Sequence, residues 1–338
     1  MLDVHSVASQ VKHNCNISDA KYWGLYSPCG LLLRLRDLYR TEKGLRPSEK
    51  AKPDDIGVWI GDREKLWEEL DSLDFQKITI NGKKYRPFDV KGINDVLLRE
   101  GLLYGAGFGN LSKPTFFLAE LVKKTRKGRY SIYISGREIS RDLSTAPAML
   151  QGNTIIARQE TMNFFLWDKF EEMKSRKYSG ALFHAFSEYG ISKDDGFAPE
   201  KLEGRLAEIA HEELSSCIYH EFGEASQRKA LGRWWKDLIV KLPYSRAELF
   251  LRGLKDILSD TCSAGMLAYI IRNKKTGSLA FYVAMLDGFR KTIFPDMAKA
   301  YDEFLITRRW PLIEKAKIQG YKKAGGYIKI LRDMADKG

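Results

Sequence analysis

Cysteine is scarce in this chain. The 338 residues include four, Cys15, Cys29, Cys217 and Cys262, and no two of them form a CxxC pair. This wide spacing excludes the disulfide framework of a small secreted domain and a cysteine-based zinc site. We therefore expect a protein of a reducing compartment and predict a cytoplasmic location.

Long apolar runs are missing as well. The longest uncharged apolar stretch covers residues 279–286, whereas a membrane-spanning helix needs about 20 such residues. The amino terminus, Met1-Leu2-Asp3, lacks the basic and apolar regions of a secretory signal. We find no internal repeat and no low-complexity tract. The sequence therefore predicts a globular chain with no membrane partner.

Positive charge exceeds negative charge. The 56 Lys and Arg residues outnumber the 44 Asp and Glu residues, which gives a net charge of +12 and a pI of about 9.3. Such a surface attracts anions, so the expected partner is an anionic small molecule or a nucleic acid. No RRM, KH or zinc-finger motif accompanies this charge. The sequence leaves the oligomeric state open.

The pattern of apolar residues predicts an α+β fold with three parts. Residues 1–50 have helical periodicity and are expected to form a helical N-terminal segment. Residues 51–160 contain hairpin signals and predict a small antiparallel β-containing module, because hairpins join antiparallel neighbours. Residues 161–338 return to helical spacing and are expected to form a larger all-α C-terminal domain.

Short signals place individual helices. We expect helices to begin at residues 18–19 and again at residues 27–28, where a proline suits the first turn. A Lys-Gly pair ends the second helix at residues 43–44. A serine before a proline predicts a capped helix over residues 112–121. A capping box at residues 245–248 predicts a helix start in the C-terminal domain.

β-branched residues and turn pairs place the strands. Residues 56–60 and 154–157 are expected to be short strands. Residues 81–82, Asn-Gly, predict a two-residue turn, because both tolerate the positive φ that this turn requires. Residues 135–136, Ser-Gly, predict the turn of a second hairpin.

Two other segments have two interpretations each. Residues 105–110, which are rich in glycine, predict with Lys113 a flexible loop or a phosphate cradle. Residues 123–130 hold the densest basic run and predict a solvated loop. The alternative for this run is a nucleic-acid contact in which Tyr130 and Tyr133 stack on bases.

One acidic segment interrupts the basic chain. Residues 200–224 hold seven acidic residues and two basic ones, together with His211 and His220. Carboxylates and imidazoles are ligands for transition metals. We therefore place the candidate site in this segment, within the C-terminal helical domain.

A helical wheel separates the two histidines. If residues 202–228 form one helix, His211 falls inside the apolar stripe. His220 is about half a turn out of phase and falls on the opposite face with Glu213 and Glu224. We therefore expect His211 to point inward and His220 to be a surface neighbour of Glu224.

Glu208 and His211 are the candidate catalytic residues. Glu208 precedes His211 by one helical turn, so their side chains are neighbours. Helical di-iron sites use this Glu-x-x-His element twice, whereas this chain has it once. We therefore expect a mononuclear iron, manganese or zinc site with Glu208, His211 and His184 as ligands. A second helix would contribute either His184 with Glu188 or Asp256 with Asp260, since each pair is one turn apart. The alternatives for His211 are a core histidine held by a carboxylate and a proton-transfer role.

Three arginines, Arg137, Arg141 and Arg158, are the candidate clamps for an anionic substrate or cofactor. Guanidinium groups hold carboxylate or phosphate in two places, and these three lie among the predicted strands. The alternative is a salt-bridge network with the acidic residues between them.

The sequence leaves three functions open. The first is a metal-dependent or acid/base enzyme that acts on an anionic substrate. The second is a protein that binds nucleic acid or another polyanion through basic surface loops. The third is a scaffold or partner-binding protein without chemistry.

Overall fold

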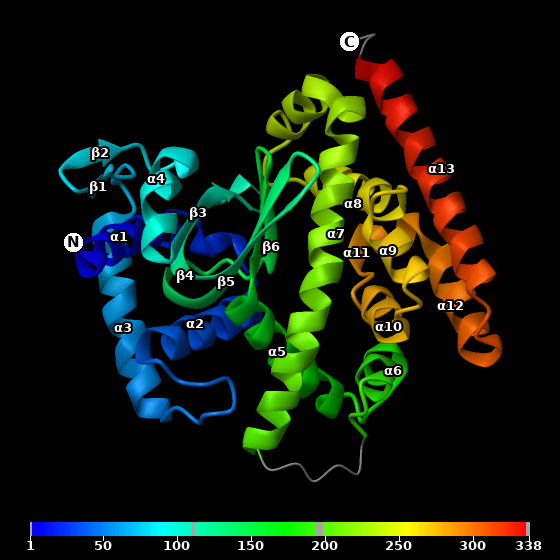
Figure 1. Cartoon of the computed structure of the whole chain (residues 1–338), viewed down its shortest axis with the longest axis horizontal. Coiled ribbons are helices and arrows are strands. Elements are labelled where there is room, and N and C mark those ends of the chain that lie inside the picture. Colours follow the sequence, from blue (N-terminus) through cyan, green and yellow to red (C-terminus); the bar gives the residue numbers. More distant parts are fainter. Residues whose placement is uncertain (1, 110–111, 193–198, 336–338) are drawn as a thin grey trace. The chain divides into compact units, whose positions relative to one another are not determined.

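The computed structural model describes residues 2–109, 112–192 and 199–335. The chain divides into two compact units. The N-terminal unit comprises Met1–Trp167 and Pro199–Ala210, and the C-terminal unit comprises Asp168–Ala198 and His211–Gly338. The predicted α+β fold class is confirmed, with helices and sheets in the first unit and helices in the second (Figure 1). In the described part of the chain, no helix is long and apolar enough to cross a membrane.

The N-terminal unit is built around a mixed sheet. Its helical segments are α1 (Val4–Tyr22), η1 (Trp23–Leu25), α2 (Pro28–Lys43), α3 (Pro53–Leu70), α4 (Val90–Leu97) and η2 (Leu98–Glu100). Its strands are β1 (Ile78–Ile80), β2 (Lys83–Tyr85), β3 (Leu102–Phe108), β4 (Pro114–Lys127), β5 (Tyr130–Arg141), β6 (Ala148–Gln151) and β7 (Thr154–Arg158). β1 and β2 form a separate hairpin, and the other strands pair in the order β3-β4-β5-β7-β6. Neighbours are antiparallel except β5 and β7, which are parallel.

Both faces of the sheet are buried. Successive side chains of β4 point to opposite faces. Phe116 packs in the cluster that includes α1 and α4, whereas Phe117 packs with Tyr133 on the other face. A strand buried on both faces carries a continuous apolar run instead of an alternating one. The helix predicted over residues 112–121 is wrong for this reason, and the residues from Pro114 onward belong to β4.

Two further strand predictions are wrong for local reasons. Residues 56–60 lie inside α3, where Pro53 occupies the first turn and Asp54 and Asp55 favour the helix start. The second hairpin does not turn at residues 135–136, because β5 continues unbroken through them. The turn lies between β4 and β5 instead, at the glycine that follows β4.

Several local signals are confirmed. Asn81 and Gly82 have φ values of 49° and 78° between β1 and β2. Ser27 caps α2, and Gly44 ends this helix in the left-handed conformation with φ 65°. Residues 154–157 lie in β7. At the β1–β2 turn and at both ends of α2, the chemistry of one or two residues fixes the backbone.

The first helix, α1, departs from the prediction. It begins after Asp3, which caps it, and no new helix begins at residues 18–19. Ser18 and Asp19 are buried within α1. The Ser18 hydroxyl donates to the carbonyl oxygen of Pro114. Asp19 accepts from the Leu143 N–H at 3.1 Å. These polar residues tie α1 to the sheet instead of capping a helix.

The C-terminal unit is helical. Two helices, α5 (Gln159–Ser175) and α7 (Pro199–Val240), contribute to both units. The others are α6 (Gly180–Glu188), α8 (Arg246–Thr261), α9 (Met266–Arg272), α10 (Thr276–Ala284), α11 (Gly288–Ile293), α12 (Pro295–Thr307) and α13 (Trp310–Ala335). The helix start predicted at residues 245–248 is confirmed. Ser245 accepts from the Glu248 N–H at 3.1 Å, and Glu248 accepts from the Tyr244 N–H at 2.9 Å.

A glycine lets α7 and α8 pack closely. A Cβ atom at Gly223 of α7 would lie 2.2 Å from the carbonyl oxygen of Ser259 on α8. Any side chain here would force the two backbones apart. A Cβ at Gly265, just after α8, would lie 2.0 Å from the same oxygen. This close approach brings polar side chains of α7 next to those of α8.

Candidate metal centre

The buried face of α7 differs from the predicted one. His211 is exposed, and so is Glu208, whose carboxylate pairs with Arg205 at 2.7 Å. The prediction that His211 points inward is therefore wrong. The wheel took apolar side chains alone as the buried face, but α7 also buries Glu213, whose carboxylate accepts hydrogen bonds from two hydroxyl groups of the same unit. The Glu213 carboxylate can be buried because these hydroxyl groups donate hydrogen bonds to it. His220, seven residues later, lies on the same side of the helix as Glu213.

The third predicted ligand, His184, lies elsewhere. It belongs to α6 and lies beside the rings of Phe183 and Tyr301, at centroid distances of 6.2 and 6.4 Å. Its Nδ1 atom is buried without a hydrogen-bond partner among the described residues. The described side chains do not bring His184 together with Glu208 and His211 as a group of three ligands. The predicted ligand set is therefore not assembled.

A different set of ligands meets between α7 and α8. His220 and Glu224 lie one turn apart on α7, and Asp256 lies on α8. One ligand atom of each lies within 4.8 Å of the others, the one such group of three within the described ranges. The three side chains are 21%, 22% and 27% exposed, so water and a small ion can reach them. An imidazole with two carboxylates is a suitable donor set for Mn²⁺, Fe²⁺ or Zn²⁺.

The orientation of His220 is fixed by Asp260. This buried carboxylate lies one turn after Asp256 on α8 and 2.7 Å from Nδ1 of His220. With Nδ1 engaged, Nε2 faces Glu224, 3.4 Å from Oε1. Metal-binding histidines are commonly held by a carboxylate on the other ring nitrogen. The arrangement therefore presents Nε2 toward Glu224.

The carboxylates of this cluster are balanced by nearby cations. Lys255 forms an ion pair with Glu224 and lies 3.9 Å from Asp256. Burial lowers the pKa of His220, but Asp260 and Glu224 more than offset this and hold the pKa well above its usual value. Burial also raises the pKa of Asp256. Lys255 has a long, partly exposed side chain that can move its ammonium group into water.

The three predicted anion clamps lie near one another on the sheet but are paired with protein carboxylates. Buried Arg158 donates two hydrogen bonds to Glu138, at 2.7 and 2.8 Å. Arg141 lies 3.4 Å from the same carboxylate. Arg137 is exposed and pairs with Glu120 at 3.1 Å. The salt-bridge alternative therefore describes all three arginines. Arg141 also retains one nitrogen, Nη1, without a hydrogen-bond partner in the described chain.

The glycine-rich segment and the basic run lie mostly in strands, apart from Gly109 after β3 and a turn at residues 128–129. Gly105 and Gly107 lie in β3, and a Cβ at Gly105 would lie 2.2 Å from Cε1 of Phe117. The predicted loop or phosphate cradle is therefore wrong for these glycines, and Asn110 lies outside the described residues. Residues 123–127 belong to β4 and not to a loop.

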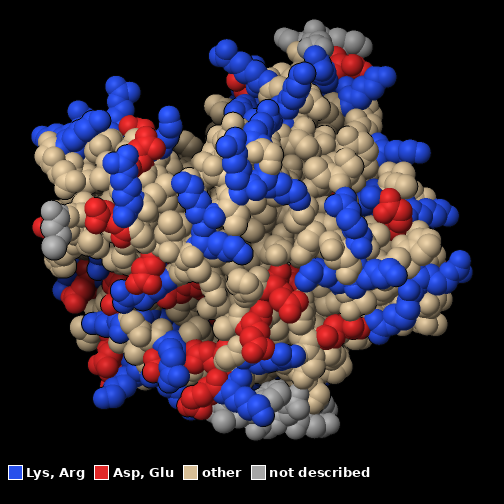
Figure 2. Space-filling model, viewed as in Figure 1, with Lys and Arg blue, Asp and Glu red and all other residues tan. Residues whose placement is uncertain are grey.

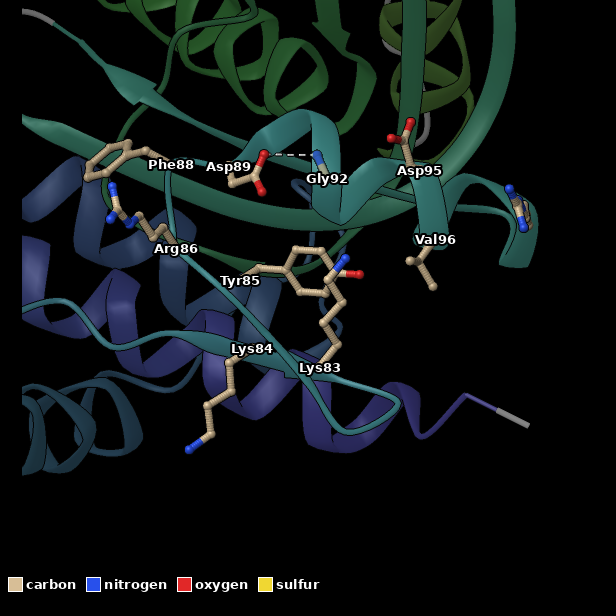
Figure 3. Close-up of a pocket in the computed structure, with 10 residues that line it drawn as sticks. Lys83, Lys84, Tyr85, Arg86, Phe88, Asp89, Gly92, Asp95 and Val96 are labelled. Atoms are coloured by element: carbon tan, nitrogen blue, oxygen red, sulfur yellow. Dashed lines mark hydrogen bonds between the residues drawn. The ribbon is translucent and has the colours of Figure 1, made fainter.

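An open pocket beside the β1–β2 hairpin lacks converging groups (Figure 3). It has a volume of about 820 Å³ and is lined by residues of β2, α4, the segment between them and η2. Asp89 is engaged in capping α4 and accepts from the Gly92 N–H at 3.0 Å. Lys83 lies over the ring of Tyr85, whereas Lys84 points away from them. We assign no site to this pocket.

Two family models match the chain. The first describes the N-terminal domain of a family of unknown function, DUF6866, and matches residues 6–158. The second describes the C-terminal domain of the same family and matches residues 163–337. No curated protein and no solved structure matches the chain. With both domain models matched in order along the sequence, the protein belongs to the DUF6866 family.

Proposed function

We propose that the protein is a metal-dependent enzyme whose ion is held by His220, Glu224 and Asp256. The convergence of these three ligands supports the proposal, and Asp260 orients His220 for it. Three protein ligands leave coordination positions open for water and substrate, as in catalytic zinc sites. A divalent ion held there would act as a Lewis acid that polarises a substrate oxygen or lowers the pKa of bound water.

An anionic substrate fits the charge around this cluster. Arg290 of α11 lies near the carboxylates of Asp256 and Asp260, and its side chain is 27% exposed. The net charge of +12 also favours the approach of anions. A carboxylate or phosphate group on Arg290 would hold the rest of the substrate beside the ion.

Metal titration tests this proposal. After treatment with EDTA, the full chain should bind about one Mn²⁺, Fe²⁺ or Zn²⁺ ion, measured by calorimetry and by elemental analysis. His220→Ala should abolish binding, because it removes a ligand. Asp260→Asn should weaken binding by about 10- to 100-fold, because it loosens the imidazole. His211→Ala is the matched control, since it removes an exposed imidazole from the same helix and should leave binding unchanged.

The Lys255→Gln variant separates a metal centre from a cluster of ion pairs. In a metal centre the ammonium group competes with the ion, so its removal should strengthen metal binding. In a purely structural cluster the variant should lose stability and gain no affinity. Absence of binding in both the wild type and Lys255→Gln would contradict the proposal.

The β4–β5 hairpin favours a second function. As the alternative, we propose that the protein binds a nucleic acid through this hairpin. Figure 2 shows Lys and Arg side chains scattered across the face in view, with Asp and Glu side chains mostly in its lower half. The β4–β5 hairpin differs from this surface of mixed charge. Its residues 122–129 are all exposed, and they include five basic residues and no acidic one. Lys124 lies over Tyr133 and Arg129 over Tyr130, at 5.6 and 5.1 Å from the ring centroids.

Salt dependence tests this alternative. In the variant Lys123→Gln, Lys124→Gln, Arg126→Gln, the slope of log affinity against log salt for a single-stranded oligonucleotide should fall by about 2 to 3, because each lost phosphate contact removes about one unit. The control replaces exposed Lys315, Lys322 and Lys329 of α13 with glutamine, which changes the net charge equally. Equal slopes in both triple variants would exclude the hairpin as the binding surface.

A further inference from the structure

The N-terminal unit contains a cleft that the metal centre does not use. Its volume is about 820 Å³, within the range of about 300–1,000 Å³ typical of small-molecule sites. Its walls come from α2 and the connection to α3, from β5, and from the N-terminal parts of α5 and α7, with Lys12 of α1 at the edge of the lining. Glu203 of α7 ties two walls together, since it accepts from the Ser48 hydroxyl at 2.9 Å and lies 3.6 Å from Arg46.

An incompletely bonded guanidinium group lines this cleft. The side chain of Arg141 is 2% exposed. Its Nε atom donates to the carbonyl oxygen of Asp142 at 3.2 Å, and Nη2 donates to that of Ser144 at 2.9 Å. Nη1 is buried and has no hydrogen-bond partner among the described residues. A buried charged donor left without a partner is costly, so an anionic oxygen of a ligand would be favoured here.

Two acceptors on α5 line the same cleft. Glu160 accepts from the Glu138 N–H through Oε2 at 2.6 Å, and within the described chain no hydrogen bond or ion pair engages Oε1. Asn163 lies one turn later, and its Oδ1 atom is buried without a partner among the described residues. The Asn163 oxygen, and the Glu160 carboxylate in its ionised form, accept hydrogen bonds from N–H donors, which an anion cannot supply. A ligand that satisfies the cleft therefore carries a donor as well as an anionic group.

The charge and the apolar surface of the cleft restrict the chemical class of the ligand further. Basic and acidic side chains line the cleft in equal number, so it has no excess of positive charge to favour a polyphosphate. Leu38, Phe164, Trp167 and Leu206 add apolar surface to the walls. Apolar walls with a few converging polar groups are typical of sites that bind small organic molecules.

We propose that this cleft binds a small zwitterion, a free α-amino acid or short peptide with an apolar side chain. The ligand carboxylate bonds to Nη1 of Arg141. The ligand ammonium group bonds to Glu160 and to Oδ1 of Asn163. The apolar side chain lies against Phe164 and Trp167. This site goes beyond the metal centre, since all its residues belong to the N-terminal unit.

Calorimetry with L-phenylalanine and two derivatives tests the proposal on the full chain. L-phenylalaninamide lacks the carboxylate, and N-acetyl-L-phenylalanine lacks the ammonium group. Each should bind at least about tenfold more weakly than L-phenylalanine. Binding of inorganic phosphate alone, equal binding of the three compounds, or no heat up to about 10 mM L-phenylalanine would each overturn the proposal.

Variants locate the ligand. Asn163→Leu and Glu160→Gln should each weaken L-phenylalanine binding by about tenfold, with circular dichroism confirming that the fold is kept. Glu171→Gln is the matched control on α5, because this exposed residue pairs with Lys174 and does not line the cleft. His220→Ala should bind L-phenylalanine as the wild type does, so failure of the metal proposal is distinguishable. Unchanged affinity in both Asn163→Leu and Glu160→Gln would overturn the assignment.

Discussion

Replacing Lys113 with methionine is expected to lower the free energy of unfolding by about 3–5 kcal/mol. Its ammonium group lies 2.9 Å from the carboxylate of Asp19 and 3.1 Å from that of Asp142, and all three side chains are buried. Methionine keeps the length of the side chain and removes the charge. Two buried carboxylates then lose the cation that contacts both of them, which is far less favourable than the intact group. Urea denaturation followed by circular dichroism measures the loss.

A second substitution shows whether uncompensated charge causes this loss. Asp19→Asn in the Lys113→Met background removes one of the two carboxylates and should recover part of the stability. Burial raises the pKa of Asp19 to about 6 although Lys113 lowers it. Without Lys113 that pKa rises further, so the loss should be smaller at pH 5 than at pH 8. A loss below about 1 kcal/mol at pH 8, or no recovery in the double variant, would contradict the explanation.

Glu160 is expected to make the stability of the protein fall as the pH rises toward 8. Burial and the neighbouring Glu138 carboxylate raise the pKa of Glu160 from 4.5 to about 7. The folded state therefore binds a proton between these values that the unfolded state has released. This contribution is fully present below pH 4.5 and is lost as the pH rises through 7. Between pH 5 and pH 8 the loss is on the order of 2 kcal/mol.

The Glu160→Gln variant measures this contribution. Glutamine stays neutral, so the variant should gain stability relative to the wild type by on the order of 2 kcal/mol from pH 5 to pH 8. Urea denaturation at several pH values gives the difference directly. Glu171→Gln, on the same helix, should follow the wild type at every pH. Parallel curves for wild type and Glu160→Gln would show that this carboxyl group titrates normally.

Local chemistry made part of the fold predictable. Asn81-Gly82, Ser27 and Gly44 act on the backbone within one or two residues, and the structure confirms their positions. The same reasoning failed for Ser18 and Asp19, because these residues look like a cap but bond to segments about a hundred residues away. A local sequence pattern does not show which distant group will form a hydrogen bond with a polar side chain.

The sequence shows only half of the proposed metal centre. His220 and Glu224 lie one turn apart, as do Asp256 and Asp260, so each pair could be recognised by its spacing. Their meeting depends on Gly223, which allows α7 to approach α8 and brings His220 within 2.7 Å of a carboxylate 40 residues away. The helical wheel of residues 202–228 did not identify the face of α7 that carries His220 as buried, because it took only apolar side chains into account. Two such pairs on neighbouring helices were the signal that sequence reasoning could have used.

The position of α1 sets an order of events during protein synthesis. Its Cys15 thiol bonds to the carbonyl oxygen of a residue 101 positions later, and its Asp19 carboxylate to a backbone N–H 124 positions later. The ribosome adds about 5–20 residues per second, so α1 waits on the order of ten seconds for its partners. During this interval the hairpin of β1 and β2 can cover part of the apolar face of α1, but the part that packs against β4 stays uncovered. We therefore expect the nascent chain to depend on chaperones mainly before β5 emerges.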